Sequence, residues 1–286
     1  MNFTKMQGAG NDFIVVEAAN LKYDWAQLAR AMCDRHFGIG ADGLLLALPS
    51  NRADIMMRMF NPDGSEAEAC GNGLRCLVKY VTEMRLLKNV GTEMSVETMA
   101  GVRQAKLFRT GSKLTKIQVT LGRPEFGAAD IPATVKAGEG EIIVDRMINY
   151  PVTTTMGQKL VLNLVSMGNP HAVHFEIDPI AEFPLSRIGP EIENLNVFPN
   201  RVNFETARVI SSNKIEVRVW ERGAGETLAC GSGAGAVAVA AQLKGHVGRK
   251  VDIMLPGGVL TVEWDGAGEV LLSGPAEAVY SGEWPK

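Results

Sequence analysis

Two stretches of sequence decide the fold: RMFNPDGSEAEACGNG at residues 58–73 and RVWERGAGETLACGSG at residues 218–233. They align without a gap, 160 residues apart. Both contain Ala-Cys-Gly-x-Gly, with Cys70 in the first stretch and Cys230 in the second. A repeat at this distance indicates a duplicated domain, because the units of solenoid arrays are only about 20–50 residues long. The chain is therefore expected to consist of two related halves.

The surroundings of the repeat predict the same local structure twice. Residues 55–60 and 214–220 are short, apolar and partly alternating, as is typical of strands, and a Gly-rich and acidic loop follows each. A helix-compatible run follows each cysteine, at 74–84 and 234–244. Further strands are expected at 13–17, 44–48, 117–121, 160–166, 207–210, 259–264 and 270–273, and a further helix at 23–33.

This mixture predicts an α+β fold with more strand than helix. We expect an N-terminal half at 1–121 and a C-terminal half at 122–273, with a tail at 274–286 that packs back on the first half. The Pro-flanked segment 124–132 is interpreted as the linker between them.

Composition narrows the class of protein. The chain has 286 residues, 46% hydrophobic and 21% charged, which is typical of globular domains. A net charge of −3 with scattered basic residues argues against nucleic acid or an anionic membrane as partner. There is no apolar run of about 18 residues and no signal pattern at the start. We therefore expect a cytoplasmic protein.

The cysteines do not suggest a disulfide scaffold or a zinc site. Four cysteines are few for a chain of this length, and no Cys-x-x-Cys pair occurs. Cys33 and Cys76 are interpreted as small core residues. Cys70 and Cys230 are different, because each is flanked by glycine ahead of a predicted helix.

A cysteine at a helix N-terminus has a distinctive environment. The positive end of the dipole and the unpaired N–H groups stabilise a thiolate, so we expect a lowered thiol pKa at both sites. The same N–H groups can bind a carboxylate, and glycine allows a ligand to approach the backbone. Each half thus offers a reactive sulfur beside an anion site.

Two such sites suit the inversion of a carbon stereocentre. One base must remove a proton from one face of the carbon while an acid delivers a proton to the other. A thiolate and a thiol, one from each half, can do this with the substrate in the cleft between the halves. No electron sink is evident, so donors around the substrate carboxylate must stabilise the carbanion.

Several segments together resemble the diaminopimelate epimerase family: GAGNDFIVVE, FNPDGSEAEACGNG, SMGNPHAV, RVNF and ERGAGETLACGSGAGA. The resemblance spans nearly the whole chain. It implies two pseudo-symmetric mixed α/β domains, each a sheet wrapped around a central helix, with the active site in the cleft between them. It also implies a cytoplasmic homodimer that needs no pyridoxal phosphate or other cofactor and no metal. The implied reaction interconverts LL- and meso-diaminopimelate in lysine and peptidoglycan biosynthesis.

The resemblance assigns roles to particular residues. Cys70 and Cys230 would be the acid–base pair. The reacting carboxylate would lie on the two helix ends, and Arg222 would grip the distal carboxylate. The substrate-binding residues implied in this way are Asn11, Asn61, Gly71, Asn72, Asn169, His171, Asn203, Glu221, Arg222, Gly231 and Ser232. One departure is Gly43, where some family members carry a substrate-contacting glutamine.

Other interpretations remain open at this point. Gly231–Ala236 and Gly38–Gly43 partly match the dinucleotide-binding fingerprint, which would make the protein a Rossmann dehydrogenase. The two repeated cysteines could instead form a redox pair, and a non-enzymatic binding module is a third class. Within the superfamily, a racemase of another amino acid is the nearest alternative.

Overall fold

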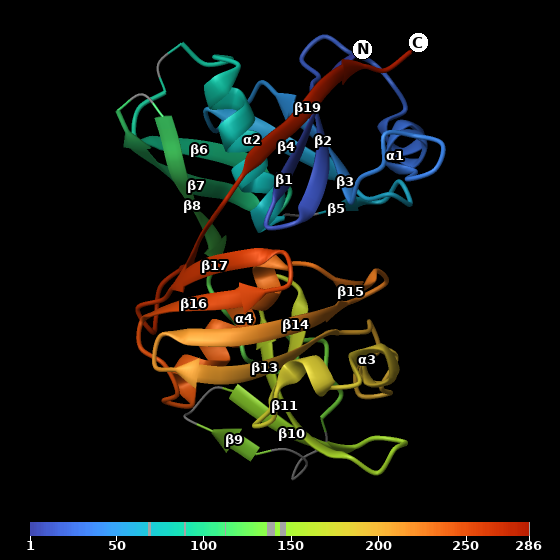
Figure 1. The fold of residues 1–286 in the computed structure, drawn as a ribbon, viewed down its shortest axis with the longest axis vertical. Coiled ribbons are helices and arrows are strands. Elements are labelled where there is room, and N and C mark those ends of the chain that lie inside the picture. Colours follow the sequence, from blue (N-terminus) through green and yellow to red (C-terminus); the bar gives the residue numbers. More distant parts are fainter. Residues whose placement is uncertain (68–69, 89, 112, 136–140, 144–146, 286) are drawn as a thin grey trace. The chain divides into compact units, whose positions relative to one another are not determined.

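A computed structural model gives the fold for residues 1–67, 70–88, 90–111, 113–135, 141–143 and 147–285. The chain divides into two compact units (Figure 1). The first unit comprises Met1–Thr120 together with Ser273–Lys286, and the second comprises Leu121–Leu272. None of the helices in these described ranges has the length and apolar character that a membrane crossing requires.

The first unit is a mixed sheet around one long helix. The helices are α1 (Trp25–Cys33) and α2 (Gly71–Glu83). The strands are β1 (Asn2–Gly8), β2 (Asn11–Glu17), β3 (Gly43–Leu48), β4 (Ile55–Phe60), β5 (Glu66–Ala67), β6 (Glu93–Thr98), β7 (Gly101–Thr110), β8 (Lys113–Gly122) and β19 (Glu277–Glu283). Their pairing order is β19-β1-β2-β3-β4-β6-β7-β8, with β5 added to β4. Helix α2 packs against β1, β2, β3, β4 and β19.

The second unit has the same design. Its helices are η1 (Ile180–Glu182), α3 (Leu185–Glu193) and α4 (Gly231–Leu243). Its strands are β9 (Glu141–Ile143), β10 (Met147–Thr153), β11 (Lys159–Ser166), β12 (Pro170–Phe175), β13 (Asn203–Ser211), β14 (Lys214–Glu221), β15 (Gly225–Thr227), β16 (Lys250–Leu255), β17 (Gly258–Glu263) and β18 (Val270–Gly274). The pairing order is β9-β10-β11-β12-β13-β14-β16-β17, with β15 added to β14. Helix α4 packs against β11, β12, β13, β16 and β17.

Strand directions show that the two units are copies. β2–β3 and β12–β13 are parallel pairs with a helix in each connection, and β3–β4 and β13–β14 are antiparallel. Leu44 faces Phe60, and Phe204 faces Trp220, so both strands of the hairpin keep the 160-residue offset of the sequence repeat. Even the ion pair within the repeat is duplicated, since Arg58 bonds Glu66 at 2.6 Å and Arg218 bonds Glu226 at 2.8 Å.

The central helices are buried because of their composition. Helix α4, GSGAGAVAVAAQL, carries mostly small apolar side chains, and all of its residues except Ser232, Gln242 and Leu243 are buried. A helix that is apolar all round is found in a protein interior. Helix α2 is amphipathic, but Asn72 to Val81 are buried without interruption. The expected α+β fold, with a sheet wrapped around a central helix in each half, is confirmed.

Three local expectations differ from the structure. Both central helices begin directly after the cysteine, three residues earlier than the apolar pattern indicates, because the Gly-rich turn is already helical. The expected linker 124–132 packs into the second unit, where Phe126 and Ile131 are buried and Glu125 bridges to Ser166. Helix α3 was not predicted, since it contains Gly189 and Pro190. Glycine is required there because a Cβ at position 189 would lie 2.5 Å from the ring of Trp220.

Candidate active site

Cys70 caps helix α2. Its backbone is extended, and its sulfur accepts a hydrogen bond from the N–H of Gly73 at 3.4 Å. The thiol also lies 3.9 Å from Oδ1 of Asn11, within the range of a weak hydrogen bond to sulfur. Cys70 is half-buried. The cysteine therefore takes the place of the Ser or Asp that usually caps a helix, with its sulfur at the positive end of the dipole.

An amide and a guanidinium surround this cap. Nδ2 of Asn72 donates to Oδ1 of Asn11 at 3.3 Å, and Oδ1 of Asn72 accepts from Arg75 at 2.7 Å. Arg75 also donates to the backbone carbonyls of Gly71 and Pro275, each at 3.2 Å. Asn72 and Arg75 have no exposed surface. Burial lowers the pKa of Arg75 to about 10, so the side chain is still cationic at pH 7.

A network of charges holds Asn11 from its other side. Nδ2 of Asn11 donates to Asp42 at 2.7 Å, and Arg35 bridges Asp42 and Asp12 at 2.7 and 2.8 Å. The buried Lys5 bonds Asp12 at 2.7 Å. Burial raises the pKa of Asp12, but hydrogen bonds from Arg35 and Lys5 outweigh it and lower the pKa to about 2. The network has two cations and two anions, so it fixes Asn11 without adding net charge.

Cys230 caps helix α4 in the same way. Its sulfur accepts from the N–H of Gly233 at 3.3 Å and lies 3.4 Å from the hydroxyl of Ser232. It is less exposed than Cys70, at 6%. The cap geometry of the two units is thus the same.

The electrostatics at Cys230 contradict the expected lowering of its pKa. Burial, followed by the carboxylates of Glu221 and Glu205, raises the pKa of the Cys230 thiol well above its ordinary value. The hydrogen bonds from Ser232 and Gly233 act in the opposite direction but are weaker. Glu221 is itself shifted, since burial raises its carboxyl pKa although Thr227 donates to it at 2.6 Å. The helix N-terminus alone does not decide the state of this thiol.

A buried His–Glu pair lies beside the cap of α4. Nδ1 of His171 bonds Oε1 of Glu205 at 2.7 Å, and both side chains are completely buried. Nε2 of His171 lies 3.0 Å from Oδ1 of Asn169, whose Nδ2 donates to Ser232 at 3.3 Å. With the Asn169 amide in this orientation, both ring nitrogens face oxygen acceptors. The His171 ring thus links Glu205 to Asn169 and, through Asn169, to Ser232 at the start of α4.

The register of the sheets identifies corresponding residues in the two half-sites. Gly43 and Asn203 are 160 residues apart, and they pair with Phe13 and His171 respectively. Two residues before Phe13 and His171 are Asn11, the first residue of β2, and Asn169, directly before β12; they contact Asn72 and Ser232, corresponding positions of the two helix N-termini. In both units, therefore, an asparagine amide contacts the second residue of the central helix. The pairs that differ include, with the first unit named first, Phe13 and His171, Leu45 and Glu205, Asn61 and Glu221, and Arg75 and Gly235.

The remaining expected residues lie at strand ends: Asn61 follows β4, Asn203 begins β13 and Arg222 follows β14. Nδ2 of Asn61 donates to the Ser65 hydroxyl at 2.9 Å. The buried Asn203 accepts from the backbone N–H of Arg222 and donates to the carbonyl of Pro170, each at 2.9 Å. The exposed Arg222 guanidinium donates to the carbonyl of Asn200 at 3.0 Å.

Gly43 stands where no side chain fits easily. It is the first residue of β3 and is buried. An added Cβ would lie 3.1 Å from both Cε of Met59 and the carbonyl oxygen of Phe60. The Met59 side chain thus occupies the space that a glutamine at this position would enter.

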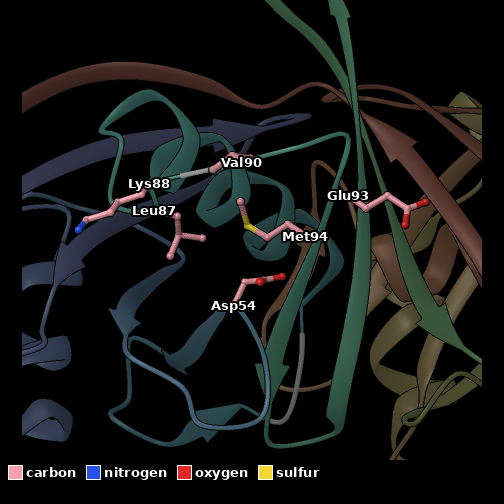
Figure 2. Close-up of a pocket in the computed structure, with 6 residues that line it drawn as sticks. All are labelled: Asp54, Leu87, Lys88, Val90, Glu93 and Met94. Carbon is pink, nitrogen blue, oxygen red and sulfur yellow. The ribbon is translucent and has the colours of Figure 1, made fainter.

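A second candidate site in the first unit lacks a comparable set of reactive side chains. A surface pocket of the first unit is lined by Asp54, Leu87, Lys88, Val90, Glu93 and Met94 (Figure 2). Lys88 and Glu93 point outward in opposite directions, and the Asp54 carboxylate accepts from Ser95. Asp54 precedes β4, whereas the loop to Cys70 follows the end of that strand. Within the described ranges, no group of three His, Cys, Asp or Glu residues could hold a metal ion.

The dinucleotide-binding alternative does not fit the strand order. Gly38–Gly43 leads into strand β3, where the fingerprint requires a helix. Gly231–Ala236 does open a helix, but the strand before it is the three-residue β15 rather than the first strand of a βαβ unit.

Two functional candidates were missed in the sequence. Arg75 and Glu205 were not singled out, although Arg75 is the one charged residue of the apolar run GLRCLV and Glu205 is the one charged residue of the strand-like segment VNFETA. Charged side chains are almost never fully buried without a special reason. That signal could have identified both.

Comparisons with known proteins agree with this arrangement. The diaminopimelate epimerase family profile matches residues 3–127 and 163–279. Proteins named diaminopimelate epimerase are 48% identical in Desulfovibrio desulfuricans (99% of this chain and 98% of that protein) and 45% identical in Pelotomaculum thermopropionicum (100% and 99%).

Solved structures share the fold at low sequence identity. A hydroxyproline epimerase from Agrobacterium vitis has a TM-score of 0.72 at 16% identity, covering 99% of this chain and 91% of that one. A phenazine biosynthesis protein of the PhzF family from Bacillus anthracis has a TM-score of 0.71 at 18% identity, covering 100% and 99%. The sequence matches go further than the fold: this chain belongs to the diaminopimelate epimerase family and is an isomerase that works without pyridoxal phosphate.

Proposed function

We propose that the protein interconverts LL- and meso-2,6-diaminopimelate by a two-base mechanism in which Cys70 and Cys230 exchange roles. One sulfur removes the α-proton as a thiolate, and the other delivers a proton to the opposite face as a thiol. The observation that carries the proposal is the duplicated cap: each cysteine accepts an N–H hydrogen bond at the first turn of a central helix. A single such sulfur would serve only one face of the carbon.

The helix N-termini suit the reacting carboxylate. The positive end of a helix dipole and its first backbone N–H groups favour an anion. Gly71 and Asn72 stand at this position in the first unit, and Gly231 and Ser232 in the second. N–H donors and positive helix ends around the carboxylate stabilise the negative charge that spreads onto it when the α-proton leaves, which would take the place of a cofactor's electron sink.

Polar residues around the caps suit the amino group and the distal end. Asn11 and Asn169 reach the helix ends, and Glu221 offers a carboxylate beside Cys230. The exposed Arg222 guanidinium keeps donors available for bidentate binding of the distal carboxylate. The remaining residues proposed to line the substrate site are Asn61, His171 and Asn203. We further expect a cytoplasmic homodimer that acts in lysine and peptidoglycan biosynthesis.

The proposal is tested by incubating the reduced enzyme with LL-diaminopimelate in deuterated water. We expect the meso isomer to accumulate, with deuterium at the inverted α-carbon, as followed by NMR and chiral chromatography. Absence of exchange in reduced, folded enzyme would refute the function. Exchange with another amino acid in place of diaminopimelate would indicate a racemase of different specificity, and it would refute the proposed substrate.

A further inference from the structure

Arg75 has a property that the acid–base pair does not explain. It is a completely buried cation whose hydrogen bonds all go to neutral oxygens: the carbonyls of Gly71 and Pro275 and the side-chain amide of Asn72. A buried charge without a counter-ion is costly, and it favours the ionisation of any acid nearby. The corresponding position in the second unit is Gly235, which has no charge.

Only a few groups can supply the negative charge. The groups that act on Arg75 electrostatically are the thiols of Cys76 and Cys70. Cys76 has no exposed surface, and burial raises its pKa to about 12, so it stays protonated. Cys70 is half-buried and accepts the Gly73 N–H at the helix N-terminus. It is therefore the thiol whose ionisation Arg75 favours.

Among the described residues, the other charges on elements packed against α2 are paired with each other, except Glu17 at the end of β2, which acts on Tyr80, ten residues beyond Cys70. The pairs are Lys5 with Asp12 from β1 and β2, Asp12 and Asp42 with Arg35, Lys79 with Glu83 and with Glu277 of β19, and Arg58 of β4 with Glu66 of β5. These pairs leave no excess of either sign next to the cap. Among the described residues, Arg75 supplies the net charge of this half-site.

The second unit has the opposite electrostatics. Cys230 lies close to the carboxyl groups of Glu221 and Glu205, and His171 bonds Glu205. An added Cβ at Gly233 would lie 2.7 Å from Oε1 of Glu205, whereas an added Cβ at Gly73 would lie 3.2 Å from Cδ2 of Leu45. At corresponding positions, therefore, the apolar side chain of Leu45 lies against α2 and the carboxylate of Glu205 lies against α4. Three ion pairs include charged groups of the strands packed on α4: His174 with Glu176, Arg208 with Glu216, and Lys250 with Glu263. Two further charged groups of these strands, Lys159 of β11 and Asp252 of β16, form no ion pair within the described residues, and Asp252 accepts from Thr261 at 2.8 Å.

We propose that Arg75 is an electrostatic positioning residue that holds Cys70 as the thiolate of the resting enzyme, while Glu221 and Glu205 keep the proton on Cys230. This inference rests on the proposed function. The resting enzyme is then predominantly in one protonation form, ready for one of the two stereoisomers. Arg75 also fixes the Asn72 amide, so that its Nδ2 faces Asn11 at the site of the reacting carboxylate.

The test is a pH titration of enzyme labelled with ¹³Cβ-cysteine, without substrate, followed by NMR from pH 6 to 10. The Cβ signals are assigned with the Cys70→Ser and Cys230→Ser variants. Cys33 and Cys76 provide internal references, because burial raises the pKa of each to about 12. We expect the Cys70 signal to change at lower pH than the Cys230 signal. Titration of Cys230 at the same or lower pH would overturn the inference.

Variants separate electrostatics from folding. Arg75→Met should move the Cys70 transition upward by about one pH unit or more, with Cys230 unchanged, and Arg75→Lys should restore most of it. Arg58→Met is the matched control, since it removes a cation paired with Glu66 and should move neither transition. If Arg75→Met does not fold, Glu221→Gln keeps the test open by lowering the Cys230 transition. A folded Arg75→Met enzyme with an unmoved Cys70 transition would contradict the role of Arg75.

The outcome is independent of the test of function. An enzyme that shows the expected order of titration but exchanges no α-hydrogen would refute the proposed function and leave the charge asymmetry intact. An active enzyme with the reverse order would refute only this inference.

Discussion

In both units a cysteine caps a thirteen-residue helix, but the side chains packed around the two caps differ in charge. Backbone geometry, the Gly N–H to sulfur hydrogen bond and the amide partner are alike. The cap of α2 has Leu45 beside it and Arg75 one turn on, whereas the cap of α4 has Glu205 and Glu221. The two units thus share one scaffold, but the side chains around the caps differ in charge at corresponding positions, with Leu45, Asn61 and Arg75 in the first unit and Glu205, Glu221 and Gly235 in the second.

This difference limits what a helix N-terminus explains. The dipole and the cap hydrogen bond favour a thiolate at both sites. At Cys230 burial and two carboxylates outweigh them and raise the thiol pKa. A reaction that needs one thiolate and one thiol requires such an inequality, because two thiolates would leave no acid to protonate the carbanion.

The largest expected effect comes from removing either sulfur. Cys70→Ser and Cys230→Ser should each lower kcat/KM by roughly 10²–10⁴-fold, because a hydroxyl is a far weaker acid and general acid–base catalysis contributes a factor of that size. Steady-state kinetics in both directions measure it. Cys33→Ala, a change in the core of the first unit, is the control and should leave kcat unchanged. Full activity in either serine variant would show that the enzyme does not need both sulfurs, and it would contradict the two-base proposal.

The loss of unfolding free energy at alkaline pH should report on the two buried thiols of the first unit, Cys33 and Cys76. Burial raises the pKa of Cys33 and of Cys76 from about 9 to about 12. Between these values the folded protein keeps protons that the unfolded chain releases, so the free energy of unfolding falls as pH rises. The slope is about 1.4 kcal/mol per pH unit for each thiol. Urea unfolding at pH 8 and 10.5 should show a smaller loss in a Cys33→Ala/Cys76→Ala variant; an identical loss would count against this assignment.

Alanine at the matching cap glycines should reveal the carboxylate against α4. Gly233→Ala puts a Cβ 2.7 Å from Oε1 of Glu205, which His171 holds in place, and should destabilise the fold by about 1–3 kcal/mol. Gly73→Ala meets the flexible end of Leu45 at 3.2 Å, and the better helix propensity of alanine offsets the contact within about 1 kcal/mol. Urea unfolding of both variants compares them directly. Equal losses would mean that Glu205 yields as easily as Leu45.

The duplicated ion pair should give the smallest difference. Arg58→Ala removes a half-exposed pair with Glu66 and should cost about 0.5–1 kcal/mol of unfolding free energy. Arg218→Ala should cost about 1–2 kcal/mol more, because Arg218 also donates to the buried turn carbonyls of Ile180 and Phe183, each at 2.9 Å. Thermal unfolding of the two variants measures the difference, and equal costs would show that these carbonyl contacts add nothing.

The sequence predicted the scaffold better than its charges. Strand β4 was placed at its observed bounds, and α2 and α4 were expected after their cysteines, because apolar periodicity and the repeat are local signals. Helix α3 escaped prediction, since its Gly189 is selected by contact with Trp220 on another strand. The contacts that Arg75 and Glu205 make could not be predicted for the same reason. Which side chain faces which depends on the register of strands distant in sequence, and no local pattern encodes that register.

The central claim is that the two caps hold one acid–base group each for opposite faces of a single carbon. It is tested most directly by the distribution of deuterium at early times, when LL-diaminopimelate reacts in deuterated water and both isomers are recovered. The account predicts deuterium in nearly every meso molecule formed and retained α-hydrogen in the unreacted LL isomer, because each sulfur exchanges with solvent on its own side. Equal deuterium in both isomers, or transfer of the original hydrogen into the product, would show that one base serves both faces and would contradict the account.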